Sequence, residues 1–283
     1  MSAGKKSVLV TGASGFVGKS VVKHLEADGW DVIPLVRSVD GNRSLKIDFE
    51  SPSVFSDLSA VPGVDAIVHL ATNVGFDGKS LEEIFLANIA ATTALITLAK
   101  HMGAHFVFAS AALVAGSKER HIGRQTPDNP DSPYMVSKLL AEQTIQASGV
   151  RQTILRIGGV FGINGPNHLG LNRAIRSVIE GEAPVVTGNG SVRRNYIYVN
   201  DIAATIADVL RRDIFGTHLV AGSESLSIKE MLSSLCEVFL PGVDPIYREG
   251  SAGFDQLIVP SPDLPGARPF RIALEDMRAE VSR

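Results

Sequence analysis

The stretch VLVTGASGFVG, residues 8–18, decides the fold of this chain. A short aliphatic run leads into three glycines at intervals of three residues, and a helical pattern follows them. Gly12 permits a tight turn, Gly15 lets backbone N–H groups approach a pyrophosphate, and Gly18 lets the helix pack closely on the strand. The helix N-terminus adds partial positive charge. The residues that we expect to contact a dinucleotide here are Gly12, Ser14, Gly15, Phe16 and Val17.

Short β-branched runs alternate with helical patterns through the N-terminal half. This βαβ alternation predicts a parallel sheet with helices on both faces, so the expected architecture is a Rossmann-type, doubly wound α/β fold. A capping box formed by Ser80 and Glu83 opens the second helix. The expected strands cover residues 7–10, 31–36, 66–70, 105–110 and 152–157, and the expected helices cover residues 16–28, 81–102 and 134–148.

The pattern changes from Pro166 onward, where a small substrate-binding lobe is expected. Prolines between residues 241 and 269 predict an irregular tail. We therefore assign residues 1–165 to a dinucleotide-binding domain and residues 166–283 mainly to the lobe, with segments that return to the first domain. The elements expected in the second part are helices near 171–180, 200–212, 228–239 and 273–281, a hairpin-like turn at 188–190 and a strand at 217–220.

Composition excludes several classes of partner. A formal net charge of -3 gives no basic field for a phosphate backbone, so no nucleic acid is expected. The single cysteine, Cys236, cannot form an intramolecular disulfide or a thiolate metal cluster, and it indicates a reducing compartment. Without a secretory h-region or an apolar stretch of about 20 residues, we expect a cytoplasmic protein with no membrane partner and no metal.

Motifs beyond the glycine turn agree in order and spacing with the extended short-chain dehydrogenases/reductases, the epimerase/dehydratase family of nucleotide-sugar enzymes. The chain resembles this family over about residues 7–230. The resemblance implies that Asp48 with Phe49 contacts the adenine, that Leu70 and Ala71 adjoin the cofactor, and that Asn88 is a structural helix residue. The motifs are TGASGFVG at 11–18, IDF at 47–49, HLA at 69–71, SPYMVSK at 132–138 and RNYIYVND at 194–201.

Tyr134 and Lys138 are the expected catalytic pair. Four residues apart on a predicted helix, they project from one face, and an ammonium near a phenol should lower the phenol pKa. The resemblance implies that Lys138 also holds the nicotinamide ribose and that Tyr134 donates a proton to a carbonyl oxygen while hydride moves to carbon. His69, at the end of a buried strand, is expected to be structural.

The family's third catalytic position, a serine or threonine, falls on Ala111, which has no hydroxyl. Ser110, one residue earlier, is therefore our candidate replacement. Removing such a donor typically costs about 10²- to 10³-fold in rate. The alternative is that Ser110 only satisfies a backbone group and that Tyr134 works unaided.

Arg37 indicates the cofactor. It stands at the end of the second expected strand, where NAD-selecting proteins place an acidic residue for the ribose 2′-OH. A guanidinium suits a 2′-phosphate, so NADP is favoured, with NAD as the alternative.

Arg194 indicates the substrate, because the resemblance places it where the diphosphate of a nucleotide-sugar is clamped. The alternative is a structural arginine that caps a carbonyl or pairs with Asp201. We expect NADPH-dependent reduction of a nucleoside-diphosphate 4-keto-6-deoxy sugar. Other possibilities are a nucleotide-sugar 4-epimerase or dehydratase that retains NAD, and a catalytically impaired NADP-binding sensor. The resemblance also implies a homodimer through helices 81–102 and 134–148.

Overall fold

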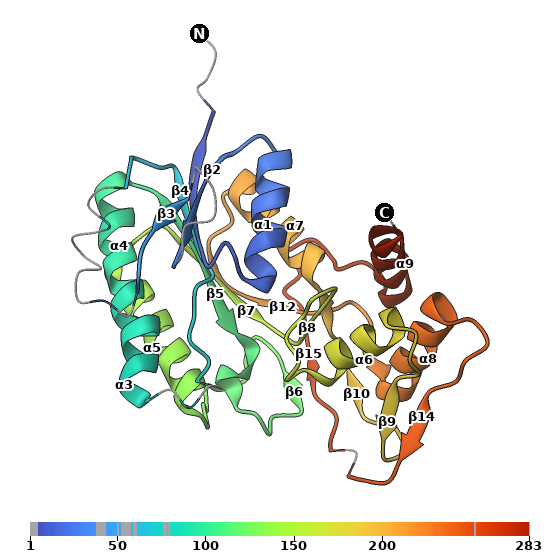
Figure 1. Cartoon of the computed structure of the whole chain (residues 1–283). Coiled ribbons are helices and arrows are strands. Elements are labelled where there is room, and N and C mark those ends of the chain that lie inside the picture. The colour runs from blue at the N-terminus through green and yellow to red at the C-terminus, as the bar shows by residue number, and fades with distance from the viewer. Residues whose placement is uncertain are drawn as a thin grey trace. The chain divides into compact units, whose positions relative to one another are not determined.

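A seven-stranded sheet organises the first part of the chain in the computed structural model, which describes residues 5–37, 44–49, 51, 58, 61–75, 78, 80–251 and 253–282. The strand order is β12-β7-β5-β4-β1-β2-β3, and β1 pairs in parallel with both β2 and β4 (Figure 1). From β1 the chain continues to β2 and β3 on one side and then to β4 and β5 on the other. Doubly wound folds bind ligands beyond the carboxyl ends of the strands at such a switch point. The strands are β1 Ser7–Thr11, β2 Asp31–Val36, β3 Leu45–Lys46, β4 Ala66–His69, β5 His105–Ala111, β7 Gln152–Ile157 and β12 Gly216–Val220.

Helices cover both faces of this sheet (Figure 1). α3 Leu81–Phe85, α4 Ala91–Met102 and α5 Pro133–Ser148 lie on one face, and α1 Phe16–Ala27 and α7 Val199–Arg212 lie on the other. Local sequence fixes the helix ends. The Ser80–Glu83 capping box opens α3, as the sequence predicts, and left-handed glycines end α4 and α5.

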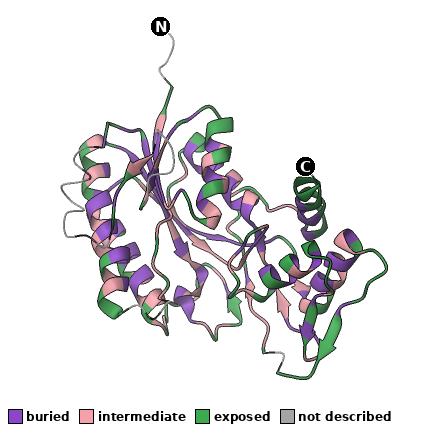
Figure 2. Ribbon diagram, viewed as in Figure 1, coloured by how far each residue is buried: buried purple, intermediate pink, exposed green. Residues whose placement is uncertain are grey.

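The core lies between the sheet and the helices α4 and α5. Strand side chains such as Leu9, Ile67 and Phe106 are fully buried and pack in one cluster with Leu95 of α4 and Ile145 of α5 (Figure 2). The strands read as continuous aliphatic runs because both faces are covered. The prediction of a doubly wound α/β fold is confirmed.

The helix expected over residues 81–102 contains a π-helical turn, Leu86–Ala90, between α3 and α4. Contrary to the sequence expectation, this whole segment is long and apolar enough by length and composition to span a membrane, with a mean hydropathy of 1.4. A core helix of a globular protein passes the same test, and Ala91, Ala94 and Leu95 pack in the core described above.

The second unit comprises residues 118–126, 157–201 and 219–283. Its helices are α6 Gly170–Ile179, α8 Ile228–Phe239 and α9 Phe270–Val281, of which α8 packs on both α6 and α9. Ser227 and Glu230 cap α8 as predicted. The short strands are β6 His121–Ile122, β8 Val160–Phe161, β9 Val185–Thr187, β10 Arg193–Arg194, β11 Ile197–Tyr198, β13 Leu226–Ser227, β14 Ile246–Arg248 and β15 Leu257–Ile258.

Two expectations for this part differ from the structure. Residues 188–190 do not close a hairpin, since β9 pairs in parallel with β14 and β10 pairs antiparallel with β13. The division at 165/166 also moves: residues 157–165 and 118–126 fall in the second unit, and residues 202–218 return to the first.

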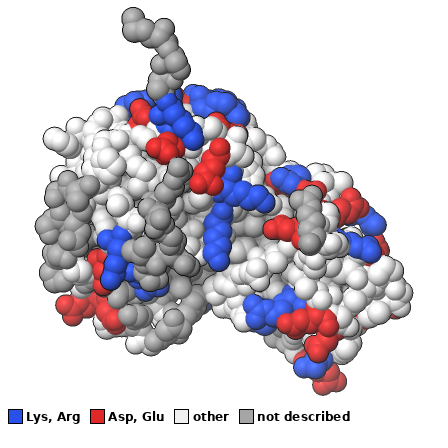
Figure 3. All heavy atoms as spheres, turned by 45° about the horizontal axis from the view of Figure 1, so that its top comes forward, with Lys and Arg blue, Asp and Glu red and all other residues white. Residues whose placement is uncertain are grey.

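Charges of both signs are interspersed on the surface. On the face shown in Figure 3, Lys and Arg side chains lie beside Asp and Glu side chains. Several exposed charges are paired, for example Arg271 with Glu237 at 2.6 Å and with Glu275 at 3.3 Å. Such exposed pairs contribute little to stability.

Candidate dinucleotide and catalytic site

The glycine turn after β1 has the geometry that a pyrophosphate needs. A Cβ on Gly18 would lie 2.0 Å from the Gly12 carbonyl oxygen, and a Cβ on Gly12 would lie 2.8 Å from the Ala71 nitrogen. Gly15 is the N-cap of α1, and no side chain among the described residues caps this helix or places an acid in its first turn. The Gly15 N–H donates to the Gly12 carbonyl at 2.9 Å and closes the turn. The backbone N–H groups of Phe16 and Val17, in the first turn of α1, are therefore the ones suited to bind an anion.

The end of β4 is fixed to the end of β1 by Thr11. Its Oγ1 accepts the backbone N–H groups of Leu70 and Ala71 at 3.2 and 3.1 Å and bonds His69 Nδ1 at 2.7 Å. These bonds hold residues 70 and 71 beside the glycine turn. They therefore place the expected cofactor-contacting segments at one edge of the sheet.

His69 is structural, as expected. The Thr92 hydroxyl donates to the Asn88 carbonyl at 2.6 Å, so it accepts from His69 Nε2 at 3.0 Å, and Nδ1 is the acceptor toward Thr11. Burial, and secondarily the charge of Lys138, lowers the His69 pKa to about 3. The ring is neutral at physiological pH and both of its nitrogens are satisfied.

The residues expected around the adenine lie at the same edge. Arg37 directly follows β2 and is exposed, and of the described residues none forms an ion pair with it. Asp48 is exposed just beyond β3, whereas Phe49 is buried with its ring 5.9 Å from that of His69. Arg37 and Asp48 are thus accessible to a ligand, while Phe49 packs mainly into the protein.

Tyr134 and Lys138 lie on α5 where the sequence places them. Ser132 caps the helix and Pro133 occupies its first turn. Lys138 Nζ donates to the Ala109 carbonyl at 2.7 Å and lies 4.6 Å from the Phe108 ring centroid and 5.9 Å from that of Tyr134. α5 is thereby fixed to the carboxyl end of β5.

The pKa values of this pair differ from the expectation. Burial raises the Tyr134 pKa to about 12, although hydrogen bonding with the Thr72 side chain opposes the rise. Burial also lowers the Lys138 pKa to about 7, opposed by the charge of Glu142. The predicted lowering of the phenol pKa is therefore wrong for the protein as described here. Desolvation outweighs the ammonium, and Tyr134 carries its proton at neutral pH.

Asn88, in the π-helical turn, connects the loop after β4 to α5. Its Oδ1 accepts from the Asn73 backbone N–H at 2.7 Å and from the Thr72 hydroxyl at 3.1 Å. Its Nδ2 donates to the Asn73 carbonyl and to Ser137 Oγ, each at 2.9 Å. The amide uses all of its bonding capacity, so its orientation is fixed. The sequence analysis identified Asn88, but it did not predict the contacts of Asn88 with Thr72 and Ser137.

Ser110 is not a free donor toward Tyr134. Its hydroxyl donates to Glu142, two helical turns beyond Tyr134 on α5. Glu142 is almost fully buried and pairs with Arg156 Nη2 at 2.7 Å, while Arg156 Nη1 contacts Asp128 at 2.7 Å. The structure gives the Ser110 hydroxyl a buried carboxylate as its partner and does not direct it at Tyr134, so the replacement of the missing hydroxyl by Ser110 stays a prediction without support from this geometry. Ala111, half-buried at the end of β5, offers no substitute.

The model of one family, the NAD-dependent epimerase/dehydratase family, matches residues 8–222. The chain belongs to this family. The UDP-glucose epimerase YtcB of Bacillus subtilis, itself uncharacterized, is 28% identical over 257 residues, covering 82% of this chain and 81% of that protein. A dTDP-4-dehydro-6-deoxy-D-allose reductase of Streptomyces bikiniensis is 27% identical, with 80% and 79% covered. UDP-N-acetylglucosamine 4-epimerase from Bacillus cereus has a similar fold, with a TM-score of 0.85 at 23% identity over 99% of this chain and 100% of that one.

Arg194 belongs to the second unit of this epimerase/dehydratase family member. Its Nη1 donates to the carbonyls of Phe254 and Arg193, the latter at 3.1 Å. Asp201 instead pairs with Arg268 at 2.6 Å. Of the two structural alternatives considered for Arg194, carbonyl capping is therefore observed and pairing with Asp201 is not.

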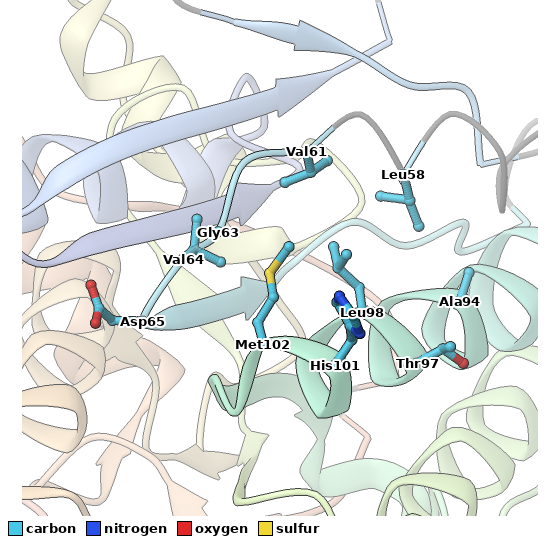
Figure 4. Close-up of a pocket in the computed structure, with 10 residues that line it drawn as sticks. All are labelled: Leu58, Val61, Gly63, Val64, Asp65, Ala94, Thr97, Leu98, His101 and Met102. Carbon is cyan, nitrogen blue, oxygen red and sulfur yellow. The ribbon is translucent and has the colours of Figure 1, made fainter.

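A cavity of about 690 Å³ lies elsewhere in the dinucleotide-binding unit (Figure 4). It is lined by Ala94, Leu98 and Met102 of α4 and by Val61 and Val64 before β4. None of the expected cofactor or catalytic residues lines it. The expected cofactor and catalytic residues lie near the ends of β1, β4 and β5, away from this cavity.

Proposed function

We propose that this protein reduces a nucleoside-diphosphate 4-keto-6-deoxy sugar with NADPH. The observation that carries the proposal is the placement of Tyr134 and Lys138 on α5, with Lys138 Nζ 5.9 Å from the Tyr134 ring centroid and bonded to the Ala109 carbonyl of β5. A protonated phenol is the form needed to donate to a carbonyl oxygen, and burial raises the Tyr134 pKa to about 12. The similarity to the dTDP-4-dehydro-6-deoxy-D-allose reductase of Streptomyces bikiniensis supports this reaction class.

The residues of the chain divide the work as follows. Backbone N–H groups at Phe16 and Val17 would bind the pyrophosphate, with Gly15 allowing its close approach, and Lys138 would position the ribose. A nicotinamide held there would supply hydride to the carbonyl carbon. Tyr134 transfers its proton to the carbonyl oxygen, so the phenol O–H breaks as the alcohol O–H forms. Proton transfer of this kind commonly contributes about 10²- to 10⁴-fold in rate.

A turnover screen tests this function. Loss of NADPH absorbance is measured with a panel of nucleoside-diphosphate 4-keto-6-deoxy sugars, with Tyr134→Phe as the matched control. The variant keeps the ring, so NADPH affinity should stay nearly unchanged while turnover falls by about 10²- to 10⁴-fold. Near-normal turnover by Tyr134→Phe would refute the mechanism.

Selection of NADP over NAD is proposed to rest on Arg37. Its exposed guanidinium follows β2, at the edge where the glycine turn lies. Asp48, with Phe49, Leu70 and Ala71, is proposed to contact the rest of the dinucleotide. Fluorescence titration should give a lower dissociation constant for NADPH than for NADH, and Arg37→Ala should remove most of the difference. Equal constants in the wild type would exclude this role.

A 4-epimerase or dehydratase with retained NAD is the second candidate, favoured by the similarity to the UDP-glucose epimerase YtcB and to the Bacillus cereus UDP-N-acetylglucosamine 4-epimerase. It would interconvert nucleotide sugars without added cofactor and without net NADPH consumption. The sensor alternative is motivated by Ala111, and it requires tight NADPH binding with no turnover of any sugar. The same screen, run with and without added cofactor, separates all three functions.

Arg194 is the residue proposed to bind the substrate. Arg194 is proposed to hold the diphosphate, so Arg194→Met should raise KM for the nucleotide sugar without changing NADPH affinity. The protein is proposed to be a cytoplasmic homodimer. An unchanged KM in Arg194→Met would leave this arginine with only its carbonyl-capping contacts to Phe254 and Arg193.

A further inference from the structure

Ala111 has no hydroxyl at the position where the family resemblance expects one. The hydroxyl of its sequence neighbour, Ser110, donates to Glu142. Reduction of a ketone nevertheless develops negative charge on the substrate oxygen, and Tyr134 alone provides one proton. A second donor near the phenol would stabilise that charge. We therefore looked for another hydroxyl near Tyr134 that could be this second donor.

Thr72 has the required placement. It follows β4 directly after Leu70 and Ala71, it is exposed to solvent, and its hydroxyl is bonded to Asn88, which also contacts α5 through Ser137. Its side chain is close enough to the Tyr134 phenol to oppose the rise in the phenol pKa. A group this close to the phenol oxygen lies within reach of a substrate oxygen bonded to the same phenol. Thr72 thus combines contact with the catalytic acid and access to a ligand.

The surrounding hydrogen bonds hold Thr72 in place. Its hydroxyl donates to Asn88 Oδ1 at 3.1 Å, and Asn88 is bonded to both backbone groups of Asn73 and to Ser137 on α5. Ser137 Oγ in turn donates to the Tyr134 carbonyl at 2.7 Å. Thr72 and Tyr134 are therefore positioned by one connected network, as a donor for charge stabilisation needs to be.

We propose that Thr72 supplies the second hydrogen-bond donor to the substrate oxygen, in place of the hydroxyl absent at Ala111. This inference rests on the proposed reduction of a keto sugar. Rotation about the Thr72 Cβ–Oγ1 bond redirects its proton from Asn88 to the developing charge without moving a heavy atom. Asn88 Oδ1 keeps its 2.7 Å bond from the Asn73 N–H, so it is not left unsatisfied.

Thr72 neither gains nor loses a proton in this scheme. The proton that completes the alcohol comes from Tyr134, whose O–H bond breaks to leave a phenolate. Thr72 donates a hydrogen bond while that transfer occurs, and it can then donate to the phenolate itself. Consistent with this, its contact opposes the rise in the Tyr134 pKa.

The test compares Thr72→Val, which keeps the shape and removes the hydroxyl, with Thr72→Ser, which keeps the hydroxyl. Thr72→Val should lower kcat by about 10²- to 10³-fold with little change in the NADPH dissociation constant. Thr72→Ser should restore kcat to within about fivefold of the wild type, and Thr72→Val/Ala111→Ser should recover part of the loss. Thr97→Val, which changes an exposed threonine on α4, is the matched control and should leave kcat unchanged.

Tyrosine labelled with ¹³C at Cζ gives a readout that needs no substrate. The chain has four tyrosines, and Tyr134→Phe assigns the signal of Tyr134. That signal should move in Thr72→Val and return toward its wild-type position in Thr72→Ser. A pattern in which the signal moves and kcat falls together supports the donor role.

Other outcomes overturn it. If the wild type reduces keto sugars and Thr72→Val does so at a similar rate, the donor role is wrong while the proposed function stands. The same conclusion follows if Thr72→Ser is as impaired as Thr72→Val, or if the Tyr134 signal does not respond to either variant. If the wild type acts on no nucleotide sugar, the proposed function fails and the donor role fails with it.

Discussion

Ser110 precedes Ala111, the position where the family resemblance expects a catalytic hydroxyl. Its hydrogen bond to Glu142 indicates a structural role instead. The hydroxyl donates to Glu142, which is buried and paired with Arg156. Ser110→Ala should lower the free energy of unfolding by about 1.5–3 kcal/mol, because it removes a hydrogen bond to a buried charge. Urea unfolding measures this loss.

Turnover is the control for Ser110→Ala. Per mole of folded protein, kcat should stay within about twofold of the wild type, because Ser110 contacts neither Tyr134 nor a ligand in this scheme. A 100-fold loss of kcat with unchanged stability, in the range expected for a missing donor, would return Ser110 to the catalytic site.

The lowered pKa of Lys138 makes the stability of the protein depend on pH. Its pKa is about 7 in the folded protein, below its ordinary value of 10.5, mainly because burial disfavours the ammonium. Between pH 7 and 10.5 the unfolded state binds a proton that the folded state does not, so stability rises with pH across this window and is lost as pH falls toward 7.

Lys138→Met should remove this dependence. The free energy of unfolding of the wild type, minus that of the variant, should increase from pH 7 to pH 9.5 by at most about 1.4 kcal/mol per pH unit. Urea unfolding at both pH values provides the measurement, and this range lies below the window in which Tyr134 titrates. Parallel stability curves for the two proteins would show that the pKa of Lys138 is not lowered.

At the scale of elements, the β1–turn–α1 unit depends on close backbone contact. Gly18→Ala would place a methyl group 2.0 Å from the Gly12 carbonyl oxygen, so the turn must open. NADPH binding should weaken at least about tenfold, because the backbone N–H groups lose their common direction. Gly63→Ala is the control, since a Cβ there meets nothing within 4 Å.

Isothermal titration calorimetry with NADPH checks the prediction for Gly18. The wild type and Gly63→Ala should bind alike. Equal affinity in Gly18→Ala would mean that the turn does not hold the pyrophosphate.

The sequence predicted most elements of the dinucleotide unit because their signals are local. β2 and β7 have the expected bounds, and the Ser80 capping box fixes the start of α3. The π-helical turn at 86–90 was missed because its Asn88 is held by the loop after β4 and by Ser137, not by neighbours in sequence. The hairpin expected at 188–190 was wrong because β9 takes its partner, β14, from a distant segment.

The same distinction applies to the candidate site. Spacing alone located Tyr134 and Lys138, since both occupy one helix. Spacing could not show that Ser110 faces Glu142, because that contact joins β5 to α5, nor that Thr72 contacts Tyr134 from the loop after β4. Polar residues that follow Leu70 and Ala71 at a parallel-strand end were the available signal for Thr72.

At the scale of the whole molecule, α4 and α5 pack together on one face of the sheet and leave apolar side chains exposed. Leu140 on α5 and Leu86 in the adjoining π-helical turn have exposed fractions of 38% and 41%. The family resemblance implies a homodimer through these helices, and burial of such side chains would contribute to an interface of about 1,200–2,000 Å².

Light scattering coupled to size-exclusion chromatography tests the dimer. The wild type should have a mass twice the 30.1 kDa of one chain, and Leu140→Arg should shift it toward a single chain, because an unpaired guanidinium would be buried at the interface. Val259→Arg, which changes an exposed apolar residue of the second unit, should leave the mass unchanged. Circular dichroism confirms that each variant is folded, since all of these positions are exposed. A wild type that remains a single chain at tens of micromolar, or a Leu140→Arg protein that stays dimeric, would mean that this face does not form the interface.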